Sequence, residues 1–444
     1  MTSFLDIVTR VRGRGDYAGD QHGGASGRDG SGMPSGGAGN FMFATGIECS
    51  YPTIAGGSVR RDQLAECGHY ERLPQDVALV RDLGLKVLRY GLPYYSIHRA
   101  AGSYDWSFAD EAMAEIRRQG ITPILDLLHF GVPDWLGDFQ NPELPLHFGD
   151  YAGAVAQRYP WVRFYTPVNE IYVTARASAL DGIWNEGMKS DRAFVTAIKH
   201  AVAASILATH AIALRRPDAV IVQSESAEYT HDGQAAVSPA VVMRNKLRFL
   251  ALDLLFARSP DADVILYAMD NGLTRQEYDW FMRGEPPGYQ VMGSDYYGRN
   301  ERICLPDGTY VGADDVLGWY QIVKEYYERY RKPVMHTETN VFDAQQAPAW
   351  LWKQWINVLR MRRDGVPVLG FTWYSLIDQI DWDIGLAEER GHVNECGLFD
   401  LQRRPRQVAA AYRDLLDAFG QITIVPHGEM FRITTEAARL KVDV

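Results

Sequence analysis

The chain has 444 residues, of which 46% are apolar and 23% charged, so it is neither disordered nor fibrous and can form a large core. A formal net charge of −11 excludes a general phosphate-backbone binder, so we expect no nucleic-acid partner and a neutral small-molecule ligand. The cysteines form no CxxC pair, which predicts buried free thiols and neither a zinc site nor a disulfide framework; they are Cys49, Cys67, Cys304 and Cys396.

The N-terminal sequence MTSFLDIVTRVRGRGD lacks the apolar core of a secretory signal. No later stretch offers about 18 uncharged apolar residues. We therefore predict a cytoplasmic location and no membrane partner, and the pattern gives no indication of an oligomeric state.

Glycine, serine and aspartate dominate residues 13–40, which predicts a flexible N-terminal segment over residues 1–40. The folded domain is expected over residues 41–420. Residues 421–444 alternate weakly between apolar and polar side chains and form a C-terminal extension compatible with a peripheral strand or hairpin.

Eight short apolar runs alternate with longer amphipathic stretches, a rhythm typical of βα units. The runs cover residues 41–48, 85–91, 121–130, 162–169, 219–226, 289–297, 332–339 and 366–374. Helical patterns lie between them, and Gly84, Gly120 and Gly365 follow helices where a C-cap is expected. The prediction is an α/β protein with one closed (β/α)8 barrel.

Barrels of this kind place their chemistry at the carboxyl ends of the strands. Polar residues follow six of the predicted strands: Arg89, His129, Asn169 with Glu170, Asp295 to Tyr297, His336 to Glu338, and Asp378, Asp381 and Trp382. Each alone is explained as a solvated loop residue or a salt-bridge partner. Their joint occurrence predicts a pocket at one mouth of the barrel.

Two glutamates, Glu170 and Glu338, end the fourth and seventh predicted strands. Facing each other across a barrel mouth, such carboxyls can flank a glycosidic bond, one protonated to donate to the leaving oxygen and one ionised to attack the anomeric carbon. Because the two carboxyls are close, their protonation states differ: the first negative charge raises the pKa of its neighbour.

The motifs around these residues resemble those of glycoside hydrolase family 1, in the clan of (β/α)8 retaining glycosidases. TPVNE resembles the acid/base motif and HTETN the nucleophile motif. The resemblance runs from about Phe41 to Phe419. It implies that Glu338 is the nucleophile and Glu170 the general acid/base of a two-step reaction through a covalent glycosyl-enzyme, with the carboxyl groups roughly 5 to 5.5 Å apart.

Further motifs of the family indicate further roles. LDLLHFGVPDWL implies that His129 binds sugar hydroxyls, and LRYGLPYYSIH implies that Arg89 steadies the charge of the nucleophile. MGSDYYGRN implies that Tyr297 lies beside the nucleophile. Asn169, which precedes the acid/base residue, would bind the sugar 2-hydroxyl.

The segment GFTWYSLIDQIDW resembles the strand-eight region of the family that holds the outer sugar hydroxyls, a role that falls here on Asp381 and Trp382. The family's tryptophan before SLID is Tyr374 in this chain, and its acidic residue is the shorter Asp381. The first strand offers Glu48 or Cys49 where the family presents a sugar-binding glutamine. We count Glu48 and Tyr374 among the candidate sugar-binding residues, and these departures concern the choice of sugar.

The predicted function is hydrolysis of small β-glycosides, β-glucosides first, with β-galactosidase or β-fucosidase activity as overlap. A transglycosylase with the same glutamates and a catalytically silent sugar-binding barrel are the alternatives, the second disfavoured because both carboxylates are present. A 6-phosphoglycosidase is disfavoured because DIGLAEERGH, after Trp382, lacks the serine and lysine such enzymes use. No metal or cofactor is expected, since no HExxH spacing or Gly-rich phosphate loop occurs.

Overall fold

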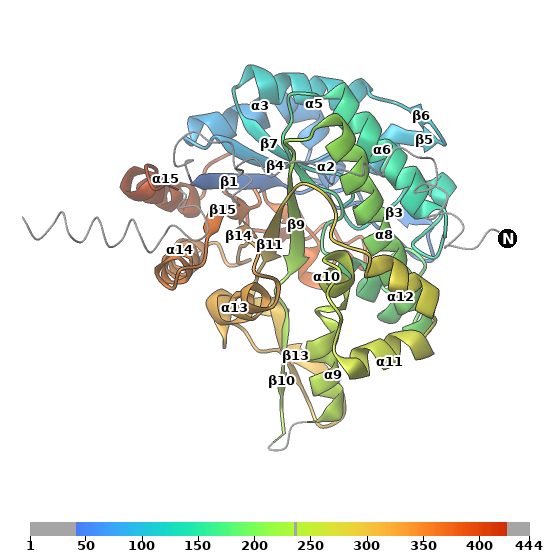
Figure 1. The fold of residues 1–444 in the computed structure, drawn as a ribbon. Helices are drawn as coiled ribbons and strands as arrows, with labels where there is room; N and C mark the ends of the chain where they lie inside the picture. The colour runs from blue at the N-terminus through green and yellow to red at the C-terminus, as the bar shows by residue number, and fades with distance from the viewer. Residues whose placement is uncertain (1–40, 235–237, 424–444) are drawn as a thin grey trace, which may run out of the picture.

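The structure, a computed structural model, describes residues 41–234 and 238–423. Eight parallel strands close into a barrel in the order β1-β15-β14-β11-β9-β8-β7-β4 (Figure 1). The N-terminal segment 1–40 and the extension beyond residue 423 lie outside the described residues. Phe41 donates its backbone N–H to the Ile422 carbonyl at 3.1 Å, so the two ends of the described chain meet at the barrel.

Every barrel strand lies inside one of the eight predicted apolar runs, which confirms the (β/α)8 fold. The strands are β1 (Met42–Ile47), β4 (Val87–Gly91), β7 (Thr122–Asp126), β8 (Phe164–Thr166), β9 (Val220–Ser226), β11 (Tyr289–Asp295), β14 (Val334–Glu338) and β15 (Val368–Tyr374). All residues of β4, β9, β14 and β15 are buried. Burial on both faces explains why these strands appear as continuous apolar runs.

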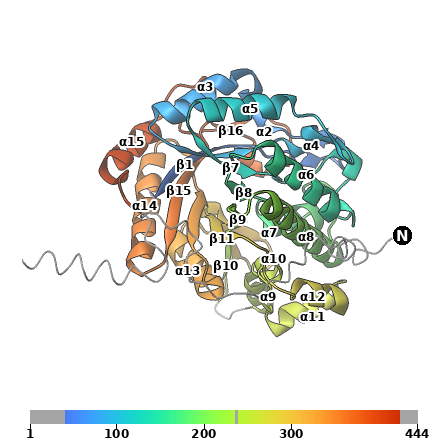
Figure 2. The ribbon, with the colours of Figure 1, turned by 45° about the horizontal axis from the view of Figure 1, so that its top comes forward.

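Helices surround the barrel (Figure 2). They are α2 (Gln63–Glu66), α3 (His69–Asp82), α4 (Tyr94–Ile97), α5 (Ser107–Arg118), α6 (Leu144–Arg158), α7 (Ile171–Ala175), α8 (Asp191–Arg215), α9 (Pro239–Leu247), α10 (Leu250–Leu255), α11 (Ala262–Asp270), α12 (Arg275–Phe281), α13 (Gly318–Tyr330), α14 (Ala347–Arg363) and α15 (Gln407–Phe419). Gly84, Gly120 and Gly365 follow α3, α5 and α14 with φ of 91°, 69° and 85°. These left-handed angles confirm the predicted C-caps.

One helix, α8, is long and apolar enough to cross a membrane by length and composition alone. In the fold, 78% of its most apolar window is buried inside the protein. A core helix of a barrel passes the same test, so α8 is weak grounds for a membrane span.

A small sheet stands beside the barrel mouth and was not predicted from the sequence. It consists of β10 (Tyr229–Asp232), β12 (Glu301–Cys304) and β13 (Tyr310–Gly312), which come from the loops after β9 and β11. The remaining strands form short pairs: β2 (Thr53–Ile54) with β3 (Val59–Arg60), β5 (His98–Ala100) with β6 (Ser103–Tyr104), and β16 (Gln379–Ile380) with β17 (Val393–Asn394). The small sheet and the β16–β17 pair supply residues that line the functional cavity.

Candidate active site

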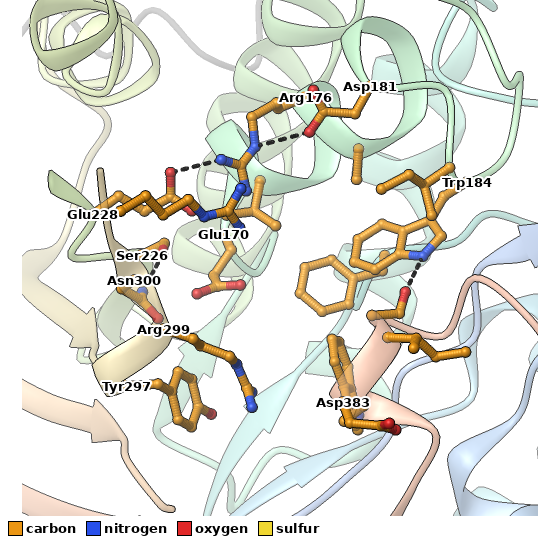
Figure 3. Close-up of a pocket in the computed structure, with 18 of the residues that line it drawn as sticks. Glu170, Arg176, Asp181, Trp184, Ser226, Glu228, Tyr297, Arg299, Asn300 and Asp383 are labelled. Atoms are coloured by element: carbon orange, nitrogen blue, oxygen red, sulfur yellow. Dashed lines mark hydrogen bonds and ion pairs between the residues drawn. The ribbon is translucent and has the colours of Figure 1, made fainter. Parts of the chain in front are cut away.

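A cavity of about 480 Å³ opens at the carboxyl ends of the barrel strands. It is lined by residues that follow β1, β7, β8, β9, β11, β14 and β15, so distant parts of the sequence meet here. Of the predicted site residues, Glu48, His129, Glu170, Tyr297, Glu338 and Trp382 line it directly. Figure 3 shows the Glu170 carboxyl pointing into this space, with Tyr297 below it and Trp184 on the opposite side.

Glu338, the last residue of β14, is held by two donors. Arg89 donates to its Oε1, and the Tyr297 hydroxyl donates to its Oε2 at 2.6 Å. Arg89 is 1% exposed and also donates to Asp126 at 2.8 Å and to Asn169 at 2.5 Å. A guanidinium and a phenol that donate to the same carboxylate fix its orientation.

Glu170 stands in the opposite electrostatic setting. It follows β8 in a left-handed conformation, with φ 40° and ψ 63°, and its N–H bonds the Ser224 carbonyl at 3.0 Å. Within the described part of the chain, nothing hydrogen-bonds its carboxyl group. Burial raises the pKa of Glu170 well above its usual value, and the charges of Asp295 and Glu338 raise it further. A proton on Glu170 is therefore favoured.

Two more buried carboxyls lie near the pair. The Ser224 hydroxyl lies 2.8 and 2.7 Å from the two carboxylate oxygens of Asp295, and burial followed by the charge of Glu338 raises the pKa of Asp295. Burial also raises the pKa of Glu225 to about 8. These residues do not line the cavity, and when they are ionised their negative charges favour a proton on Glu170.

A group of polar and aromatic residues lines the side of the cavity next to β1, β7 and β15. Glu48 accepts from the backbone N–H of Ser50 at 2.8 Å and from Gln379 at 2.7 Å. His129 lies 3.9 Å from Glu48 and bonds Asp126 through Nδ1 at 2.7 Å. Asn169 bonds the other ring nitrogen of His129 at 3.2 Å, which gives this wall a fixed arrangement of donors and acceptors.

Three predicted residues support the cavity from behind its wall. Arg89 donates to Glu338, and Asn169 bonds His129. The ring of Tyr374 stacks parallel to His129 with centroids 6.4 Å apart, and its hydroxyl donates to the Ile47 carbonyl at 3.3 Å. Gly46 makes room for that ring, because a Cβ there would lie 2.0 Å from it. The neighbouring Trp373 is fully buried and bonds the Cys396 carbonyl at 3.0 Å.

The structure contradicts the predicted sugar contact of Asp381. This residue is fully buried, does not line the cavity, and pairs with Arg61 at 3.0 Å. It also accepts the backbone N–H groups of residues 390, 391 and 392 at 2.8, 3.0 and 2.8 Å. Its oxygens are therefore occupied in holding this loop, and Trp382 alone of the predicted pair lines the cavity.

Sequence reasoning missed several lining residues. The only local signal for Gln379 is its position two residues before Asp381, because residues two apart in an extended segment share a face. The others are charged residues in loops without a motif: Arg176, Glu228, Arg299 and Arg302. Only the folding of separate loops brings these side chains to one cavity.

One group in the described part of the chain has metal-ligand geometry: Cys49, Asp126 and His129, whose ligand atoms lie within 4.8 Å of one another. Burial raises the pKa of the Cys49 thiol to about 11, which disfavours the thiolate a metal needs. Asp126 is already hydrogen-bonded to Arg89 and His129. The chemistry of this donor set fits a hydrogen-bonded support for His129.

Two buried carboxyls at the ends of the fourth and seventh strands of a (β/α)8 barrel define a glycosidase-like protein. The family model "Glycosyl hydrolase family 1" matches residues 50–242. Over these residues, which are less than half of the chain, the sequence is similar to this family, in agreement with the resemblance of the motifs around Glu170.

Curated relatives share about a fifth of their residues with the chain. A chloroplastic galactolipid galactosyltransferase from Arabidopsis thaliana is 22% identical in a 365-residue alignment that covers 75% of this chain and 55% of that protein, so the chain spans little more than half of its length. A "Probable inactive beta-glucosidase 14" from Oryza sativa subsp. japonica is 22% identical over 78% of this chain and 81% of its own.

The fold is similar to that of a solved β-glucosidase from Thermotoga maritima in complex with azafagomine. The TM-score is 0.72 at 19% identity, with 85% of this chain and 98% of the other covered. At this identity the likeness shows the (β/α)8 fold.

Proposed function

We propose that the protein hydrolyses small β-glycosides, β-glucosides first, by a two-step double displacement that retains the anomeric configuration. The observation that carries the proposal is the electrostatic contrast between two glutamates of one cavity. Arg89 and Tyr297 hold Glu338, whereas burial and neighbouring carboxyls raise the pKa of Glu170. Such a contrast suits Glu338, held by two donors, to attack and Glu170 to donate a proton.

In the first step Glu338 attacks the anomeric carbon while Glu170 gives its proton to the leaving oxygen. This forms a glycosyl-enzyme ester and releases the aglycone. In the second step Glu170, now ionised, takes a proton from water, which attacks the same carbon and frees Glu338. Two displacements at one carbon retain its configuration.

The sugar would bind against the wall that carries Glu48, His129, Gln379 and Trp382. Glu48 and Gln379 present acceptors and donors for hydroxyl groups, and the Trp382 ring suits the apolar face of a pyranose. Asn169 is buried behind this wall and bonds Arg89 and His129, so its proposed contact with the 2-hydroxyl, which strengthens in the transition state, requires its amide to turn toward the sugar.

The test is a panel of 4-nitrophenyl α- and β-glycosides with wild type and Glu338→Gly. We expect hydrolysis of β-glycosides only by wild type, and loss of at least about 10³-fold in kcat for the variant. Azide should rescue the variant and give the α-glycosyl azide, since it occupies the place of the missing carboxylate. Glu285→Gly, at an exposed residue, is the control and should match wild type.

The matching experiment on Glu170 separates the two roles. Glu170→Ala with azide should give the β-glycosyl azide, because azide then attacks the glycosyl-enzyme in place of water. NMR of the first product should show the β-anomer. An α-anomer from wild type, or wild-type activity in Glu338→Gly, would overturn the mechanism.

Transfer to another sugar or alcohol is the second candidate, because a relative is named a galactosyltransferase. The same glycosyl-enzyme would then react with an acceptor hydroxyl, and product analysis with added glycerol or disaccharide separates this activity from hydrolysis. A silent binding barrel, in keeping with the relative named inactive, would release no phenol from any glycoside. We also propose a cytoplasmic location, which the buried, unpaired thiols of all four cysteines support.

A further inference from the structure

The cavity mouth next to Glu170 is rich in arginine although the protein as a whole carries a charge of −11. Arg176 lies in the π-helical turn Arg176–Leu180, which continues from the residues after Glu170. Arg302 comes from β12 of the small sheet, and Arg299 from the turn after β11. All three line the same cavity as the two glutamates.

Arg176 is neutralised by protein carboxylates. It lies 2.9 Å from Glu228 and 3.5 Å from Asp181, and it is buried. Figure 3 shows these two ion pairs above the Glu170 carboxyl. Arg176 is therefore accounted for as part of the wall.

Arg299 and Arg302 differ from Arg176 in that neither side chain makes a close ion pair, although the charge of Glu228, which pairs with Arg176, also acts on Arg302. Over residues 41–234 and 238–423, neither side chain forms a salt bridge or a hydrogen bond. The Arg299 guanidinium lies against the rings of Tyr297 and Phe342, 4.4 Å from each centroid, and Figure 3 shows it extending into the cavity. Arg302 is half-buried, and the neighbouring charge of Arg176 lowers its pKa.

The Arg299 side chain is exposed and that of Arg302 is half-buried, so each guanidinium is within reach of a ligand that enters the cavity. Its planar fork matches carboxylate and phosphate oxygens in a bidentate geometry. The arginines at this mouth stand beside apolar side chains that are unusually exposed, with Ile183, Tyr310 and Val311 at 40%, 38% and 43%. Guanidinium groups beside exposed apolar side chains suit a ligand that has an apolar body and an acidic group.

The position of Arg299 and Arg302 in the cavity indicates which part of the substrate they would contact. In the proposed function, on which this step rests, Glu170 protonates the leaving oxygen, so the aglycone lies on the Glu170 side. The opposite wall carries the carboxylate of Glu48, which would repel an anionic sugar.

We propose that the preferred substrate carries an anionic aglycone, a carboxylate or a phosphate on an apolar or aromatic body, bound by Arg299 and Arg302. The sugar itself is uncharged.

The test uses 1-thio-β-D-glucosides, whose sulfur resists acid-assisted cleavage, so that binding to the intact wild-type protein is measured apart from hydrolysis. The probes are the 4-carboxyphenyl thioglucoside and its uncharged isostere, the 4-carbamoylphenyl thioglucoside, with a 4-(phosphonooxy)phenyl probe to distinguish phosphate from carboxylate. Calorimetry should show at least one acid binding about tenfold tighter or more than the carboxamide. The difference should shrink as sodium chloride rises.

Arg302→Gln and Arg299→Gln should each reduce that preference by about tenfold and leave binding of the carboxamide unchanged. Arg302→Lys keeps the charge but loses the fork, and should lie between wild type and Arg302→Gln. Arg275→Gln changes the net charge equally on the exposed face of α12 and should match wild type. Thermal melting of each variant verifies that it is folded.

Equal binding of the acids and the carboxamide, or a preference that survives in both glutamine variants, would overturn the proposal. The proposed hydrolysis is tested separately with the oxygen-linked 4-carboxyphenyl β-D-glucoside. Tight, arginine-dependent binding of the thioglucosides without hydrolysis of the oxygen glycoside would uphold the anion site and refute the hydrolytic function.

Discussion

Tyr297 donates its phenolic hydrogen to Oε2 of Glu338 at 2.6 Å, and Arg89 donates to the other oxygen of the same carboxylate. Tyr297 follows β11 and Arg89 lies in β4, and these strands are on different sides of β14 in the barrel order. The carboxylate is therefore oriented by the barrel frame and not by its own loop.

Replacing Tyr297 by phenylalanine removes one donor while keeping the ring. A hydrogen bond to a charged group contributes about 1.5 to 3 kcal/mol, so we expect kcat on a 4-nitrophenyl β-glucoside to fall by about ten- to a hundredfold. The melting temperature should change little, because the ring packing remains. Steady-state kinetics check this, and an unchanged kcat would contradict a role for Tyr297 in orienting the nucleophile.

The raised pKa of Glu170 predicts the pH dependence of activity. Burial and the neighbouring carboxyls favour the protonated form, so activity should be lost as pH rises through this pKa and not as it falls. Glu170→Gln cannot titrate and should lack the alkaline limb. The comparison is kcat/KM against pH for both proteins with a 4-nitrophenyl β-glucoside, whose leaving group still benefits from protonation in wild type; an alkaline limb identical in both proteins would assign it to another group.

Glu225 predicts a pH dependence of stability. Its pKa rises from 4.5 to about 8 in the folded protein because it is buried. Between these values the folded protein holds a proton that the unfolded chain has lost, so the free energy of unfolding decreases by up to about 1.4 kcal/mol per pH unit as pH rises. Glu225→Gln should remove this part of the slope.

Urea unfolding at pH 5, 6, 7 and 8 measures the difference between wild type and Glu225→Gln. Exposed Glu285 replaced by glutamine is the control and should keep the wild-type slope. Parallel curves for wild type and Glu225→Gln would show that Glu225 does not bind the proton.

Substitutions of Asp381 and Glu48 should distinguish an effect on the free energy of unfolding from an effect on substrate binding. Asp381→Asn weakens a fully buried ion pair and the hold on residues 390–392, so we expect the free energy of unfolding to fall by about 1 to 3 kcal/mol, with KM nearly unchanged below the melting range. Glu48→Gln, on the cavity wall, should change KM with a smaller effect on stability. A changed KM with unchanged stability in Asp381→Asn would instead support Asp381 as a sugar-binding residue.

The barrel and its glutamate pair could be predicted from the sequence because both depend on local patterns. Continuous β-branched runs such as residues 219–226 specify buried parallel strands, and strand ends at Glu170 and Glu338 lie at one rim in any such barrel. Asp381 was misjudged because its motif position does not reveal Arg61, 320 residues earlier, which binds it.

The sequence by itself determined the (β/α)8 fold, its eight strands, and the positions from which Glu170 and Glu338 reach the mouth. Only the tertiary structure decided which loop side chains face the cavity. Arg299 and Arg302 belong to a turn and a small sheet that form where the loops after β9 and β11 meet, and Gln379 reaches Glu48 across the closure of the barrel. Burial periodicity is a property of neighbours along the chain, whereas these contacts join residues far apart in it, so no local pattern encodes them.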